Sequence, residues 1–138
     1  MIVNIFTDGG ARGNPGPAGF GLVVYDASKN TIHQDSVFIG TKTNNEAEYS
    51  ALLNAIEWVK NNHSSHQITK INFHSDSQLL VRQMQGLYKV KAQNLRPFHQ
   101  KCLDLLTEMD LPYSFIDIRR ELNCHADELA NNAMDRGI

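Results

Sequence analysis

Four acidic residues stand where a folded chain could hold their carboxylates close together. Asp8 and Asp76 each end a segment with the pattern of a β-strand, and Glu48 and Asp127 each lie at the start of a segment with helical spacing. Carboxyl ends of neighbouring strands and starts of covering helices meet at one rim of an α/β sheet, so we expect the four side chains to converge. Clustered carboxylates repel one another and raise each other's pKa, and divalent cations relieve that repulsion.

These donors favour a hard cation. No Cys and His residues have the spacing of a zinc site, whereas carboxylate oxygens suit Mg²⁺, or Mn²⁺ in its place. Two such ions about 3.5–4 Å apart form a phosphodiester-cleaving site, in which one activates a water and the other stabilises the leaving oxygen. The pattern alone leaves a second interpretation open, which is four unrelated surface acids among fifteen Asp and Glu residues.

Helical periodicity separates Glu48 from its neighbour Glu46. The apolar stripe of this helix includes Leu52 and Ala55, which follow Glu48 by four and seven residues, so Glu48 falls on the buried face. Glu46 is two residues earlier, roughly 200° around the helix. We therefore predict that Glu48 points inward and that Glu46 is solvated.

A glycine-rich segment follows Asp8. Its tight backbone, from Gly9 to Gly16, could approach a bulky ligand closely. A carboxylate at the tip of a buried strand is costly unless it is paired, which favours a held acid at Asp8. The alternative is an ordinary Asp-Gly hairpin turn at the end of the strand.

The length predicts a single domain over residues 1–138, and hydrophobic patterning predicts that its class is α/β. The first three strands are expected to be antiparallel, and the later order of strand and helix indicates a right-handed parallel crossover. The expected strands are residues 1–8, 19–26, 31–39, 68–75 and 113–118. The expected helices are residues 46–61, 77–85, 97–109 and 126–134.

Composition limits the class of protein. A hydrophobic content of 41% and a charged content of 20% are typical of a soluble globular domain. The net charge of −2 is a poor match for binding nucleic acid by charge alone, so a polyanion would need a basic patch or a bridging metal ion. The apolar runs are too short for a membrane span, and no secretory signal is recognisable. Cys102 and Cys124 are expected to be reduced thiols of a cytoplasmic protein, with one disulfide as the alternative.

Five segments together resemble type 1 ribonuclease H in order and spacing, and cover nearly the whole chain. They read IFTDGGARGNPGPAGFG, TNNEAEYSAL, FHSDSQLLVRQ, GLYKVKAQNL and ADELAN. The resemblance implies hydrolysis of the RNA strand of RNA–DNA hybrids, with 5′-phosphate and 3′-hydroxyl ends. It also implies the ribonuclease H-like fold, a five-stranded mixed sheet with helices on both faces.

Carried over by position, the resemblance assigns catalysis and the binding of two Mg²⁺ or Mn²⁺ ions to the same acids, Asp8, Glu48, Asp76 and Asp127. It also implies substrate contacts at Asn14, Thr43, Asn45 and Gln78. The two asparagines would read RNA 2′-hydroxyls or base edges, and Thr43 would touch a DNA phosphate. Capping and turn formation are the structural roles open to the same side chains.

The chain departs from the family pattern at two places. The loop before the last helix, where many members carry a histidine, is contracted to residues 119–123, and the adjacent His125 is expected inside the helix start. A basic protrusion rich in Trp and Lys is absent, which suggests the small subgroup without it. The phosphate contacts expected here are Lys89, Arg119 and Arg120, with a solvated charged loop as the alternative for the arginines.

The leading hypothesis is a metal-dependent endonuclease whose partner is an RNA–DNA hybrid, with no membrane and no obligate protein partner. The alternative is a catalytically weak or inactive nucleic-acid-binding module on the same fold. A nucleotide-binding protein fits poorly, because the glycine-rich segment has neither the GxGxxG nor the GxxxxGK[ST] spacing and leads into a strand-like sequence.

Overall fold

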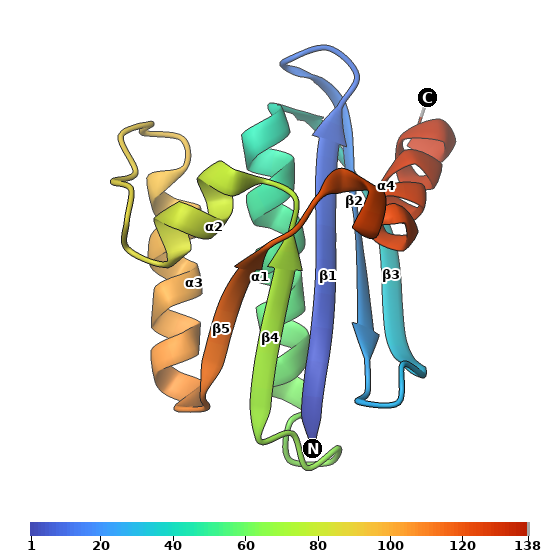
Figure 1. The fold of residues 1–138 in the computed structure, drawn as a ribbon. Helices are drawn as coiled ribbons and strands as arrows, with labels where there is room; N and C mark the ends of the chain where they lie inside the picture. The colour runs from blue at the N-terminus through green and yellow to red at the C-terminus, as the bar shows by residue number, and fades with distance from the viewer. Residues whose placement is uncertain (138) are drawn as a thin grey trace.

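A computed structural model describes residues 1–137 and places five strands in one mixed sheet (Figure 1). The strands are β1 (Ile2–Ala11), β2 (Gly16–Tyr25), β3 (Thr31–Lys42), β4 (Lys70–Ser75) and β5 (Tyr113–Asp117). The helices are α1 (Asn44–Asn62), α2 (Gln78–Met84), α3 (Arg96–Met109), the 3₁₀ turn η1 (Arg120–Leu122) and α4 (Cys124–Gly137). The strand order is β3-β2-β1-β4-β5, antiparallel as far as β1 and parallel from β1 through β4 to β5. This confirms the expected fold.

Helices cover both faces of the sheet, and alternate residues of β2 show how. Phe20 and Leu22 belong to the main core together with α1 residues such as Leu52. Gly21, between them, faces the opposite way, where a Cβ atom would lie 2.3 Å from the carbonyl oxygen of Ala126 in α4. Figure 1 shows α1 and α4 on opposite sides of the sheet. Because successive residues of a strand face opposite sides of the sheet, β2 packs against both helical layers at once.

β1 is longer than its parallel neighbour, and this creates the setting for the site. The β1–β4 ladder ends at the pair Thr7 and Ser75, while β1 continues to Ala11 beside β2. Asp8 is thus the first residue of β1 beyond the end of β4. The prediction that the strand ends at Asp8 was wrong by three residues, because the following glycines pair with β2 instead of turning. The alternative of an Asp-Gly turn was also wrong. β1 and β2 do form a hairpin, but its turn lies at residues 12–15 and is closed by the Arg12 amide, which donates to the Pro17 carbonyl.

The other element boundaries lie within three residues of those predicted. The largest changes after β1 are at β2, which begins at Gly16, at β3, which extends to Lys42, and at α4. α4 begins at Cys124 instead of Ala126 and extends to Gly137. Its first turn forms early because the Asp127 amide donates to the Asn123 carbonyl at 3.0 Å. Part of the expected loop before it, Arg120–Leu122, is a 3₁₀ turn.

Cys102 is buried and Cys124 is exposed, and both are free thiols, so the alternative of a disulfide does not apply. Of the helices in residues 1–137, none has both the length and the apolar character that crossing a bilayer requires.

A close approach of α1 to β1 depends on Gly9. A Cβ atom at Gly9 would lie 2.4 Å from the carbonyl carbon of Ala47, inside the backbone of α1, whereas one at Gly10 would make ordinary contact with Met134 at 3.6 Å. We predict that Gly9→Ala lowers the free energy of unfolding by about 1–3 kcal/mol, the usual cost of overpacking. Gly10→Ala is the matched control and should change it by much less. Equal midpoints of urea denaturation for the two variants would contradict this packing.

Candidate functional site

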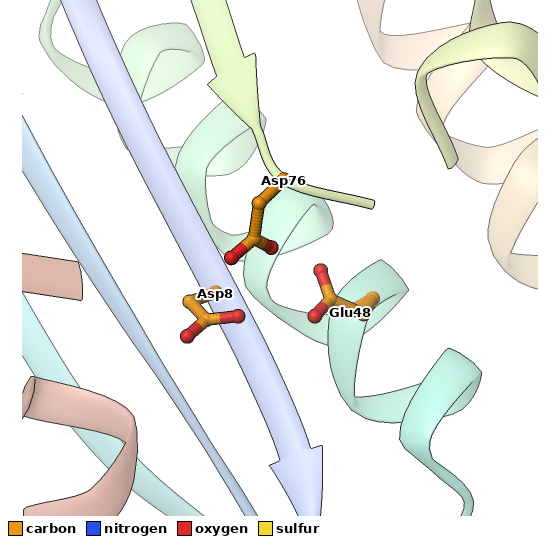
Figure 2. Close-up of side chains that lie close together, drawn as sticks. All are labelled: Asp8, Glu48 and Asp76. Carbon is orange, nitrogen blue, oxygen red and sulfur yellow. The ribbon is translucent and has the colours of Figure 1, made fainter. Parts of the chain in front are cut away.

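Three carboxylates from three separate elements meet at the end of β4. Asp8 comes from β1, Glu48 from α1, and Asp76 from the residue after β4. One oxygen from each carboxylate lies within 4.8 Å of the other two. Figure 2 shows the three side chains directed toward one another across the space beyond the last residue of β4. The cluster therefore forms only when the sheet and α1 are assembled.

Backbone geometry explains this meeting. The Gly9 amide donates to Asp8 Oδ1 at 3.0 Å and to Glu48 Oε1 at 3.2 Å, so one N–H bridges the strand and the helix. Because β4 stops at Ser75, no strand separates Glu48 from Asp8 at this level of the sheet. Asp8 and Glu48 are each only 8% exposed. Two acids are thus held in a largely desolvated position.

The electrostatics of the cluster are unfavourable for three ionised acids. Burial, followed by the Asp76 charge, raises the pKa of Asp8 from 3.8 to about 7. Burial, followed by the Asp8 charge, raises the pKa of Glu48 well above its usual value. Burial also raises the pKa of Asp76, although the Arg120 guanidinium acts to lower it. A divalent cation would relieve all three effects.

The donors fit such a cation. Glu48 Oε2 is buried and has no hydrogen-bond partner among residues 1–137, which leaves an oxygen lone pair free inside the cluster. Buried polar atoms without partners are rare and require an explanation. Carboxylate oxygens are the ligands that Mg²⁺ and Mn²⁺ prefer. The cluster could therefore hold a hard divalent ion.

Asp127 is a fourth acid at this site, in addition to the three whose oxygens lie within 4.8 Å of one another. It stands in the first turn of α4 and lines a cleft of about 640 Å³ together with the three clustered acids. Its carboxyl also contributes to raising the pKa of Asp8. The fourth acid thus faces the same cleft from the opposite helical layer.

Glu46 has a different role from Glu48. Thr43 Oγ1 accepts from the Glu46 amide at 3.1 Å, and Glu46 Oε1 accepts from the Thr43 amide at 2.9 Å. These reciprocal bonds form a capping box at the start of α1. The bond from Thr43 lowers the pKa of Glu46. Glu46 is therefore half-buried in the helix cap, not free in solvent as the periodicity suggested.

The residues expected to contact substrate are spread along the rim. Asn45 lines the main cleft. Asn14, in the turn between β1 and β2, accepts through Oδ1 from the Asn44 amide at 3.0 Å. Gln78 is exposed and shares a neighbouring pocket with Asp76. The turn and the start of α1 are thus fixed beside the acids.

The basic residues occupy two places. Arg120 lines both the main cleft and the pocket that holds Gln78, and Arg119 lines that second pocket. Lys89 lies in the segment between α2 and α3, next to Tyr88. His125, inside α4 as expected, has Nδ1 2.6 Å from the Tyr25 hydroxyl and is absent from the cleft lining.

Sequence reasoning missed two asparagines at the site. Asn44 Oδ1 accepts from the Ala11 amide at 2.8 Å and joins the end of β1 to α1. Asn123 is 1% exposed, and its Nδ2 donates to the Thr7 carbonyl at 2.9 Å. Neither has a periodic signal, because each lies next to a helix start, where polar residues are common for local reasons.

Comparisons with known proteins agree with this fold and site. A family described as reverse transcriptase-like matches residues 6–133. The structure of LC11-RNase H1 in complex with an RNA/DNA hybrid is 44% identical, with a TM-score of 0.93 and 98% of each chain covered. RNase H1 of the archaeon Halobacterium salinarum is 34% identical, with a TM-score of 0.89 and 99% of each chain covered.

Among curated proteins, the ribonuclease HI of Halobacterium salinarum is 35% identical over 133 residues. A bifunctional protein of Mycobacterium tuberculosis is 39% identical over 137 residues. The chain spans 64% of the length of the first relative and 36% of the second. Together with the fold and the acidic cluster, these matches show that the chain belongs to the ribonuclease H1 family.

The raised pKa of Asp8 makes stability depend on pH. The pKa of Asp8 is 3.8 ordinarily and about 7 in the folded protein, so the folded state binds this proton more tightly than the unfolded chain does. The stability gained in this way is complete below about pH 4 and is lost as the pH rises through 7. We predict that the metal-free protein loses on the order of a few kcal/mol of unfolding free energy between pH 4 and pH 8. Asp8→Asn should reduce this loss.

Urea denaturation in the presence of a chelator, at several pH values, measures the effect. The same pH dependence in the wild type and in Asp8→Asn would contradict the repulsion assigned to Asp8.

Proposed function

We propose that this chain is an endonuclease that hydrolyses the RNA strand of RNA–DNA hybrids and leaves 5′-phosphate and 3′-hydroxyl ends. The observation that carries the proposal is the cluster of Asp8, Glu48 and Asp76 in an open cleft. Support comes from LC11-RNase H1, which is 44% identical and whose structure contains an RNA/DNA hybrid. The same proposal includes a cytoplasmic location and an RNA–DNA hybrid as the only required partner.

The acids would act as ligands for two Mg²⁺ or Mn²⁺ ions. Asp8 is suited to a shared ligand, because its carboxyl interacts with those of Glu48, Asp76 and Asp127. When bound, such ions supply an activated water and stabilise the charge at the scissile phosphate. The frame of β1 and α1 holds the ligand oxygens in place before substrate arrives.

The rim supplies groups for both strands of a hybrid. Asn14 and Asn45 carry amides that can read RNA 2′-hydroxyls or base edges in the minor groove. Thr43 and Gln78 are hydrogen-bonding side chains suited to backbone contacts. Phosphates of the hybrid would be neutralised by the cations Lys89, Arg119 and Arg120. Because the net charge of the chain is −2, binding a polyanion requires such positive charge near the site.

Catalysis can be tested on a labelled hybrid with Mg²⁺ or Mn²⁺, with chelator, and with duplex DNA and duplex RNA as controls. Glu48→Gln should lower kcat by about 10²-fold or more, because the loss of a single electrostatic contact has effects of that size in enzymes. Glu46→Gln should change kcat little, since glutamine also completes a capping box. Asp8→Asn should abolish cleavage and keep the circular dichroism spectrum of the wild type.

Two outcomes would count against the proposal. Normal cleavage by Asp8→Asn would exclude the assigned ligand. Hybrid binding without metal-dependent cleavage by the wild type would favour the alternative of a binding module on this fold.

Substrate binding should depend strongly on salt. Each phosphate contact contributes about 0.7–0.9 to the slope of log affinity against log salt concentration. Replacing Lys89, Arg119 and Arg120 by glutamine should therefore reduce the slope by about 2 to 3. Lys70→Gln is the control, because Lys70 begins β4 at the end opposite Asp76. A slope equal to that of the wild type in the triple variant would refute these contacts.

A further inference from the structure

Asn123 is a buried polar residue between three parts of the candidate site. Its backbone carbonyl accepts the Asp127 amide at 3.0 Å and so forms the first turn of α4. Its side chain, in contrast, leaves the helix and reaches the sheet, where Nδ2 donates to the Thr7 carbonyl at 2.9 Å. Thr7 directly precedes Asp8 in β1. A single residue thus connects the start of α4 with the strand that carries the central acid.

The Asn123 side chain also acts on Asp76, whose pKa it acts to lower. The Thr7 carbonyl can accept a hydrogen bond but cannot donate one, so the amide nitrogen of Asn123 must be the atom that faces it. This assigns the orientation of the amide without reference to any ligand.

The ordinary explanation for an asparagine before a helix does not apply here. A capping asparagine accepts, through its side-chain oxygen, from a backbone amide of the first turn. Asn123 Oδ1 is buried and has no hydrogen-bond partner within the described part of the chain, residues 1–137. An unsatisfied buried acceptor costs about 1–3 kcal/mol. The amide is therefore held with its nitrogen toward the Thr7 carbonyl, although this orientation leaves its oxygen without a partner and does not cap the helix.

We propose that Asn123 is a positioning residue that fixes the α4 start bearing Asp127 relative to Asp8 in β1, so that the acids have ligand spacing before metal binds. This inference rests on the proposed function, because it assumes that these acids bind metal. Groups that orient metal ligands affect metal affinity or activity by about 10- to 100-fold when they are replaced.

The proposal is tested by Asn123→Leu and Asn123→Ser. The first keeps nearly the same size and adds no charge but loses the amide donor, and the second keeps only a hydroxyl donor on a shorter side chain. Asn62→Leu is the matched control, because the Asn62 amide makes a similar bond at 2.8 Å to the Trp58 carbonyl, at the far end of α1. Mn²⁺ binding without substrate is measured by calorimetry, and kcat and KM are measured on a hybrid.

We expect both Asn123 variants to remain folded and to bind Mn²⁺ about 10- to 100-fold more weakly than the wild type. Their kcat should fall while KM for the hybrid changes less than about twofold, since Asn123 is buried and does not touch substrate. The Asn62 variant should match the wild type in Mn²⁺ affinity, kcat and KM. A purely structural role would lower the melting temperature and leave the Mn²⁺ affinity of the folded variants unchanged.

Two results would overturn the positioning role of Asn123 alone, and a third would overturn the proposed function as well. Wild-type Mn²⁺ affinity in a folded Asn123 variant overturns the positioning role. Unfolding of both Asn123 variants at 25 °C also overturns it, because Asn123 would then be required for the fold. If the wild type itself neither binds Mn²⁺ nor cleaves the hybrid, the proposed function fails, and the positioning role fails with it.

Discussion

Mutual repulsion among desolvated carboxylates is the constraint on which the rest of the structure depends. Asp8 and Glu48 are nearly buried, and each lies within reach of Asp76. Burial and neighbouring charge raise the pKa values of all three acids, so the folded chain holds groups that would separate if they were free. A site of this kind gives up stability for function, as strained and charged clusters in active sites commonly do. The fold must supply a rigid frame to oppose the repulsion.

That frame comes from unequal strands and close packing. Because β1 extends beyond the end of β4, there is open space beside Asp8 that a side chain from α1 can enter. The absence of a side chain at Gly9 lets α1 approach, and the Gly9 amide then bonds to both Asp8 and Glu48. On the other face, α4 brings Asp127 to the same cleft. Acids that are distant in sequence thus become neighbours through backbone geometry.

Much of this was predictable from the sequence, and the failures have physical causes. The five strands and the inward direction of Glu48 were predictable because periodicity reports which side of an element faces the core. Helices on both faces were expected from the family resemblance and not from periodicity. The extension of β1 past Asp8 was not predictable, because glycines carry no periodic signal. The role of Asn123 was also hidden, since Thr7 lies 116 residues away in the chain. Contacts of this range become visible only when topology is known.

Anomalous diffraction from crystals of the protein soaked in Mn²⁺ tests the metal assignment most directly, because it locates ions without reference to activity. We expect strong peaks in the cleft, with oxygens of Asp8, Glu48 and Asp76 as ligands, and no such peaks in crystals of Asp8→Asn. Peaks confined to other surface acids, or undiminished peaks in Asp8→Asn, would contradict the claim that this cluster is a metal site.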